Sequence, residues 1–429
     1  FAYTPNPSSP HLLAIRGGFG IAYNRMQQAV TLNGRANPPL VTSLNAVCTD
    51  NAQTSCPGVL YAASSSATDI NGYPVNPTAK VPIGSNNLPI GGAPISIYSV
   101  QQNLPTPLTY KTSLGIEYAL TPTWIASVGY QGSISRHYTH LNNLNFTNYP
   151  NLNPAISQFY FFSNDASASS HALLLELKHT FGHNFTLDGQ YRWGKIMDTA
   201  SQDYYIDQYP FDSRYAYGPA DYDVTHNAKL YGTYSPKLFP HNRLLEGVFG
   251  GLQLSGIITY HTGFPWTPIY SNTGCNVVYV GSGYCNLRPG ARIAQGSHDT
   301  SNDTFKRENG QFTNGALSYF TVPTFPTAGV PPPPGVGRNS LRGPNYFDTD
   351  MDAQKTFGLP PNRILGENTG LTIRAMFFNL FNQTNLTPFN TGDANTQIST
   401  DGTNSNPLFG QSSGALGSRT IEFQARFNF

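Results

Sequence analysis

The end of the chain, residues 419–429, alternates strictly between apolar and polar side chains, and this pattern constrains the fold more than any other feature. The odd positions carry Ile421, Phe423, Ala425, Phe427 and Phe429. The even positions carry Thr420, Glu422, Gln424, Arg426 and Asn428. A period of two is the period of a β-strand with one apolar face. The segment is therefore predicted to be a strand between an apolar and a polar environment, as in a soluble β-sandwich or a membrane barrel.

The same alternation recurs along the whole chain. It predicts strands over residues 13–23, 108–120, 124–134, 173–181, 185–193, 228–234, 252–260, 347–357, 371–381 and 419–429. This makes about ten strands, most of them about 9–13 residues long, whereas soluble strands usually have about 5–6 residues. A membrane-spanning β-strand needs about 9–11 residues. The lengths favour an all-β, antiparallel transmembrane β-barrel over a soluble sandwich.

The predicted connections alternate in length. Short links join the strands within pairs, at 121–123, 182–184, 238–250 and 358–370. Long links join successive pairs, at 24–107, 141–170, 198–226, 265–346 and 386–418. Short turns on one side and long loops on the other are typical of outer-membrane barrels. Five long loops would count against a compact soluble domain, so we expect periplasmic turns and long extracellular loops.

The composition agrees with a wall between two solvents. Only 11% of the residues are charged, against about 25% in soluble domains. The formal net charge of +1 gives no reason to expect a nucleic-acid partner. No apolar run is long enough for a transmembrane helix. We expect the few charges to gather on the lumen faces and at the strand ends.

Aromatic residues near the predicted strand ends suggest two interfacial girdles. The set near the short turns is Tyr118, Trp124, Phe181, Phe185 and Phe357. The set near the long loops is Tyr138, Tyr260, Phe264 and Trp266. Lys355 departs from the pattern because it lies on the apolar side of its strand. Near the periplasmic interface its amine would reach water at little cost.

Three carboxylates share one face of the strand 347–357, at Asp348, Asp350 and Asp352. They could bind a cation through oxygen ligands, but a water-facing lumen wall explains them better. Basic residues on the same side of other strands would neutralise them in part: Lys111, Arg192, Lys229, Arg374 and Arg426. No catalytic motif, metal-ligand spacing or phosphate-binding loop is present. We therefore expect no enzyme activity, no cofactor and no metal site.

The four cysteines form two local pairs. Cys48 and Cys56 share the first long loop, and Cys275 and Cys285 share the fourth. Their spacings do not match those of zinc sites. Two disulfides in surface loops are expected, which implies an oxidising compartment.

Several segments resemble the barrel of TonB-dependent transporters, and most closely the Oar-like group. They are AIRGGFGIAYNRM (14–26), LQLSGIITYHTGFPWTP (252–268), RAMFFNLFNQTNL (374–386) and the terminal RTIEFQARFNF. The resemblance implies a Gram-negative outer membrane location and a barrel of 22 strands, of which residues 1–429 would be the C-terminal portion. Neither a plug domain nor a TonB box is recognised in the sequence. Met376 stands where family members often carry an acidic residue.

The resemblance also implies partners. Phe423, Phe427 and Phe429 look like the terminal signal read by the barrel assembly machinery. Outer-membrane lipid would surround the wall, and TonB would act through an N-terminal part that is missing here. The expected function is energised uptake of a bulky, scarce solute of unknown identity.

Three alternatives are open: a surface-adhesion or export protein, a passive porin, and a ten-stranded outer-membrane protease. The protease would need a constellation at the loop-side rim. His137, His140, Asp198 and Asp223 lie near that rim, but no spacing among them indicates catalysis.

Overall fold

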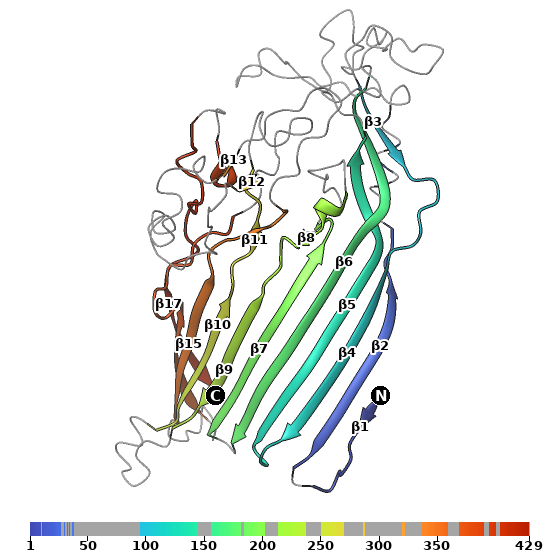
Figure 1. Cartoon of the computed structure of the whole chain (residues 1–429). Coiled ribbons are helices and arrows are strands. Elements are labelled where there is room, and N and C mark those ends of the chain that lie inside the picture. Colours follow the sequence, from blue (N-terminus) through green and yellow to red (C-terminus); the bar gives the residue numbers. More distant parts are fainter. Residues whose placement is uncertain are drawn as a thin grey trace, which may run out of the picture.

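The computed structural model contains one large β-sheet whose strands form a curved, tilted wall (Figure 1). The residues that the structure describes are 1–9, 11–26, 30, 32, 34, 37, 95–144, 156–181, 184–201, 213–236, 250–269, 286–287, 320–321, 337–358, 369–389, 394–399 and 404–428. The main path of the sheet is β1-β2-β4-β5-β6-β7-β9-β10-β15-β16-β17, with β3 beside β6 and β8 beside β7. Apart from the parallel pair β3–β6, neighbouring strands are antiparallel.

All ten predicted strands are present. They are β2 (Leu13–Tyr23), β4 (Leu108–Ala119), β5 (Trp124–Asn143), β6 (Ile156–Phe181), β7 (Phe185–Asp198), β9 (His226–Tyr234), β10 (Leu252–His261), β15 (Tyr346–Gly358), β16 (Gly370–Phe378) and β17 (Thr420–Asn428). We call these ten strands the wall. The prediction of an antiparallel all-β fold is confirmed.

Shorter strands lie around the wall. They are β1 (Ala2–Tyr3), β3 (Ile95–Val100), β8 (Gly218–Pro219), β11 (Pro265–Trp266), β12 (Asn286–Leu287), β13 (Phe320–Thr321) and β14 (Leu341–Arg342). β11 pairs with β14, and β12 pairs with β13. Two 3₁₀ turns, Ser213–Ala216 and Ala394–Thr396, lie between strands. None of the helical turns in this part of the chain has the length and apolar character that a membrane span requires.

The prediction of a long loop over 141–170 is wrong, because β5 and β6 continue far into it. The register shifts between Ser135 and Tyr138 and again between Tyr138 and His140, where His137 has a φ of 62°. These irregularities interrupt the alternation of apolar and polar residues, so the sequence pattern did not indicate that the two strands extend further. Leu141 and Phe162 then pack with Val30 in a small hydrophobic cluster, which gives the extended hairpin its own core.

The register gives the wall two chemically different faces. Directly opposed residues share a face, so Val128, Leu175 and Tyr191 lie on one side of three neighbouring strands. Glu176 lies between Ser127 and Gln190 on the other side. Across the matched positions of the wall, every aspartate and glutamate lies on this second, polar face: Glu117, Glu176, Asp188, Asp198, Asp348, Asp350, Asp352 and Glu422.

The wall is an open sheet within the described residues. β1 covers the outer edge of β2 only at Ile15 and Arg16, and no ladder joins β17 to β1 or β2. Figure 1 shows β17 curling back at one end of the wall while β1 and β2 stand at the other. Because an unpaired strand edge exposes polar backbone groups, both edges are expected to need a partner within a membrane.

Candidate functional site

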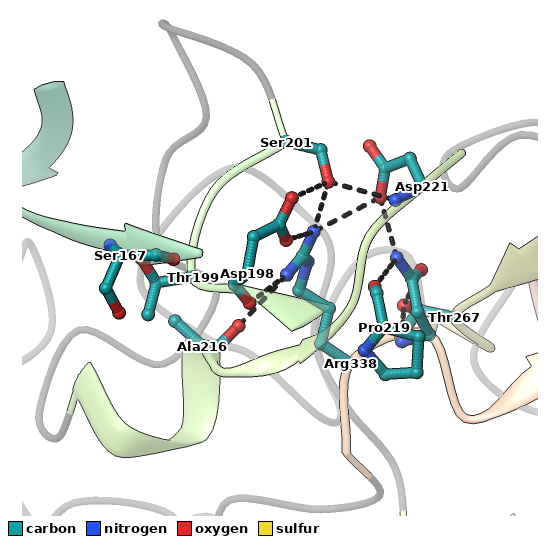
Figure 2. Close-up of polar contacts among 10 residues, drawn as sticks. Ser167, Asp198, Thr199, Ser201, Ala216, Pro219, Asp221, Thr267 and Arg338 are labelled. Carbon is teal, nitrogen blue, oxygen red and sulfur yellow. Dashed lines mark hydrogen bonds and ion pairs between the residues drawn. The ribbon is translucent and has the colours of Figure 1, made fainter. Parts of the chain in front are cut away.

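The most elaborate polar site of the described residues lies at the loop-side ends of β7, β9, β10 and β15. Figure 2 shows the part of this site around Arg338. Two arginines of one segment, Arg338 and Arg342, bind three aspartates, one at the end of β7 and two between β7 and β9. We call these five residues the arginine clasp: Arg338, Arg342, Asp198, Asp221 and Asp223. The clasp brings together parts of the chain that are separated by more than a hundred positions.

Arg338 is the centre of the clasp and is almost fully buried. Its Nη2 lies 2.7 Å from Asp198 Oδ1 and 3.4 Å from Asp221 Oδ1. The same nitrogen donates to Ser201 Oγ at 2.6 Å. Nη1 donates to the carbonyl oxygens of Asp198, at 2.8 Å, and Ala216, at 3.1 Å. A buried guanidinium is tolerated only when its donors are matched in this way.

Arg342 repeats the arrangement beside the first pair. Its Nη2 is paired with the Asp223 carboxylate, and its Nη1 donates to the Asp223 carbonyl oxygen at 2.7 Å and the Gly263 carbonyl oxygen at 3.3 Å. The second oxygen of the fully buried Asp223 accepts from the backbone N–H of Ile196 at 2.6 Å. Each arginine therefore joins the end of the wall to a loop segment.

The backbone around the clasp is closely fitted. Asn339 has a φ of 55°, a region that asparagine tolerates better than most residues. Its Nδ2 donates to Pro219 O and Asp221 Oδ1, both at 2.7 Å, and its N–H donates to Thr267 Oγ1 at 2.8 Å. A Cβ on Gly218 would lie 2.6 Å from the carbonyl oxygen of Arg338. Glycine is required at this position because the two backbones touch.

The electrostatics of the clasp leave it slightly acidic, with three aspartates against two arginines. Tyr222 lies beside it, and desolvation followed by the charges of Asp198 and Asp221 raises the pKa of its phenol. The hydroxyl therefore stays neutral.

The protease alternative requires Asp198, Asp223 and His140 to meet at one site, but the two aspartates contact Arg338 and Arg342, while His140 pairs with Asp165 at 3.1 Å.

An aromatic cluster adjoins the clasp. The ring centroid of Trp266 lies 5.1 Å from that of Phe389 and 5.6 Å from that of Phe409, which lies 5.6 Å from Phe320. All four side chains are buried. Two further buried residues, Ile269 and Ile398, are joined through their backbones, because the Ile398 N–H donates to the Ile269 carbonyl oxygen at 2.8 Å. The clasp and this cluster together are the loop layer.

Two predicted girdle residues lie elsewhere. Trp266 has no exposed surface and belongs to the loop layer, because β11 pairs with β14 and turns its ring inward. The Tyr138 hydroxyl bonds Thr109 Oγ1 at 3.0 Å on the polar face, because the irregular register reverses its side. Tyr260 lies on the apolar face as expected.

The predicted lumen residues all lie on the polar face of β15, β16 and β17. Asp352 pairs with Arg374, and Asp350 accepts from the backbone N–H of Asn379 at 2.9 Å. Asp348 accepts from the Tyr346 hydroxyl at 3.1 Å. Arg426 stands opposite Thr372. The three carboxylates therefore have separate partners, and no cluster of potential metal ligands is found among the described residues.

The remaining predicted residues divide into two groups. Phe423 and Phe427 lie on the apolar face of β17 with 78% and 44% of their surface exposed. Phe429 and the four cysteines lie outside the described residues, so the assembly signal and the two disulfides stay predictions. The arginine clasp was missed because nothing in the local sequence links Arg338 to Asp198. The available signal was that the loop 198–226 is rich in aspartate while the segment 338–342 carries two arginines.

Comparison with known proteins places the chain among membrane barrels. A family model described as "Outer membrane beta barrel domain" matches residues 1–422. A comparison with curated proteins found no match.

Several solved structures resemble the chain, all at low identity. The outer membrane transporter YddB from Escherichia coli is 10% identical with a TM-score of 0.40, over 79% of this chain and 34% of that chain. The FrpB iron transporter from Neisseria meningitidis is 11% identical with a TM-score of 0.41, over 99% and 38%. The pyoverdine receptor FpvA from Pseudomonas aeruginosa is 13% identical with a TM-score of 0.38, over 76% and 30%. The chain thus spans about a third of the length of these proteins.

Proposed function

Since this chain belongs to the family of outer membrane β-barrel domains, and so lies in the outer membrane, we propose that it forms part of a transporter that takes up a bulky, scarce solute with energy supplied through TonB. In this proposal residues 1–429 are the C-terminal portion of the barrel, in the Oar-like group. The segments quoted above for the resemblance are its sequence basis.

The width of the wall supports a large barrel. Ten long strands lie side by side, and within the described residues the sheet does not close on itself. A barrel of ten strands would pair β17 with β2. Further strands are therefore proposed to complete the wall, which makes the enclosed lumen wide enough for a bulky solute and a plug. The polar face, with Asp348, Asp350, Asp352, Arg374 and Arg426, would line this lumen.

The loop layer is the observation that carries the proposal. At the loop-side end of the wall this chain builds a buried clasp and an aromatic cluster, which hold loop bases together. Arg338 has no exposed side-chain surface, so the bases of neighbouring loops are held in a fixed arrangement. Fixed bases position the outer parts of the loops for the capture of one class of solute, because preorganisation lowers the entropy lost on binding. A plug would then be displaced to admit the solute.

Uptake by living cells tests the proposal. Cells that produce the intact protein and cells that lack it would grow in the same complex medium, and mass spectrometry would follow which solutes disappear. We expect depletion of specific bulky solutes only in producing cells, and loss of this depletion when a protonophore removes the inner-membrane proton gradient. Depletion that survives the protonophore, or none at all, would contradict energised uptake.

Conductance separates the proposal from a passive porin. The intact protein in a planar lipid bilayer is expected to show no steady open-channel current, because a plug would fill the lumen. A large, stable current would support the porin. Absence of both current and solute depletion, together with binding of cells to a surface, would support an adhesin.

The proposed assembly signal has its own test. Removal of Phe429 is expected to reduce the amount of folded protein in the outer membrane, since the barrel assembly machinery would no longer recognise the terminal strand. Substitution of Asn428 by Ser is a control of similar size that leaves the terminal aromatic residue in place. Normal assembly without Phe429 would contradict the reading of this terminus.

A further inference from the structure

The apolar face of the wall carries very few charged groups, and their placement is uneven. At the matched positions of the wall this face holds no acidic residue, as described above. Its cations are Arg136, Lys195 and Lys355, and it also carries the histidines His171, His179 and His226. A cation facing a membrane without a counter-ion calls for an explanation.

The amine of Lys355 binds groups of the protein itself. It lies near the short-turn end of β15, where its Nζ donates to the carbonyl oxygen of Gly250 and stands 4.8 Å from the centroid of the Phe357 ring. The amine thus turns back to the membrane surface on the turn side. No lipid partner is needed for this lysine.

Lys195 stands at the opposite boundary of the membrane. At about 3.4 Å per residue and a tilt of about 40°, β7 climbs about 25 Å from Phe185 to Lys195. This equals the height of the apolar band of an outer-membrane barrel, which is about 25 Å. Lys195 therefore lies at the loop-side interface, where lipid headgroups begin.

The neighbours of Lys195 form a cationic patch. Lys195 is directly opposite His171, and both are exposed. His171 Nδ1 lies 2.7 Å from the Tyr130 hydroxyl, and the two rings are stacked with their centroids 6.2 Å apart. The exposed Arg136 follows further toward the loops on the same side of β5. In the described part of the chain, neither Lys195 nor Arg136 has an acidic partner.

The surface below the patch is apolar. Trp193 lies on the same face as Lys195 with 55% of its surface exposed, and Leu173 stands opposite it. An indole at this depth is typical of a membrane interface. The combination of a cationic rim above apolar side chains is complementary to a molecule with an anionic head and hydrocarbon tails.

We propose that His171 and Lys195 bind the phosphate of an anionic lipid in the loop-side leaflet, with its acyl chains along Leu173 and Trp193. Arg136, four positions beyond the residue opposite His171, adds positive charge further toward the loops. Tyr130 orients the His171 ring. When its hydroxyl donates to Nδ1, the Nε2–H is free to donate to a phosphate oxygen. Lys195 and Arg136 supply the charge that the apolar face otherwise lacks. The proposal depends on the membrane location of the wall and not on energised uptake.

Lipid binding to the intact protein, purified in a neutral detergent, tests the proposal by native mass spectrometry. The probes are dioleoyl phosphatidic acid, dioleoylglycerol with the same chains but no phosphate, and inorganic phosphate as a competitor. We expect retention of phosphatidic acid over dioleoylglycerol. K195Q should weaken this retention about fivefold, as one cation near an anionic lipid surface would, and K195Q with R136Q should weaken it further.

K355Q is the matched control because it removes the same charge from the same face at the other boundary. It should leave retention of phosphatidic acid unchanged, and H171Q should weaken retention less than K195Q does. Equal retention of the two lipids, an unchanged affinity in K195Q, or an equal loss in K355Q would overturn the proposal. Displacement of the lipid by inorganic phosphate at the same concentration would also overturn it, since it would show a site for free phosphate.

Discussion

The wall and the loop layer above it are held together by different chemistry. The wall depends on continuous backbone ladders, and its side chains sort into an apolar face and a polar face whose ion pairs, such as Arg374–Asp352, are partly exposed. The loop layer has short ladders, such as β11–β14, and is stabilised instead by buried side chains, with Arg338 and Trp266 at its two centres. In the wall, the effect of a substitution on stability should therefore depend on which face it lies on. In the loop layer, it should depend on the particular contacts that the side chain makes.

The comparison shows that individual side chains are specified more strictly in the loop layer than in the wall. In the wall, one apolar residue can replace another on the same face because lipid adapts to either. In the loop layer, the two terminal nitrogens of Arg338 bind oxygens of four residues, Asp198, Ser201, Ala216 and Asp221, so that shape and charge are both specified. The following predictions test this contrast, in order of decreasing effect.

The largest effect is expected for Arg338→Leu. It leaves the carboxylate of Asp198 buried without its cation, and breaking a buried ion pair costs about 3–5 kcal/mol. The loop layer should open while the wall persists, which limited proteolysis of the loops together with heat-resistant barrel migration on gels would show. Arg419→Leu is the control, since Arg419 is exposed and should leave both readouts unchanged. Loops that stay protected in Arg338→Leu would contradict the role of the clasp.

The second effect concerns the two faces of the wall. Leu175→Arg places a cation on the apolar face near the middle of the membrane and should cost about 2–4 kcal/mol. Leu174→Arg is its matched control, because the neighbouring leucine points to the polar face beside Arg192. Unfolding by urea in lipid vesicles would compare them. Equal losses for the two variants would show that the assigned faces are wrong.

A third, smaller effect is expected for Gly218→Ala. The added Cβ would clash with the carbonyl oxygen of Arg338, 2.6 Å away, and such overpacking typically costs about 1–3 kcal/mol. The clasp would be strained without any change of charge, so proteolysis of the loops should accelerate less than in Arg338→Leu. Gly337→Ala is the control, since no atom lies within 4 Å of a Cβ at that position. Similar proteolysis rates for both alanine variants would argue against close fitting at Gly218.

The smallest effect is expected for Arg374→Gln on the polar face. Arg374 and Asp352 form an ion pair whose side chains are 41% and 16% exposed, and ion pairs in contact with water are worth about 0–1 kcal/mol. The same urea unfolding experiment should detect little change. A loss as large as that of Leu175→Arg would mean that the pair is shielded from water, contrary to a water-filled lumen.

The positions of the strands followed from the sequence because alternation with a period of two is a local property. Residues 419–429 carry the pattern in full, and β17 occupies the same stretch. The polar placement of Asp348, Asp350 and Asp352 followed for the same reason. Where the strand geometry is irregular, as at His137, the pattern breaks and the extension of β5 and β6 went undetected.

The sequence by itself determined an antiparallel wall of long strands, its two faces, and turns and loops on opposite sides, because each of these depends on neighbouring residues. Only the tertiary structure decided that Arg338 meets Asp198 and Asp221, that Trp266 is buried, and that Lys195 stands beside His171. These contacts join residues far apart in the chain. They depend on strand order, register and loop packing, and no local periodicity encodes such long-range geometry.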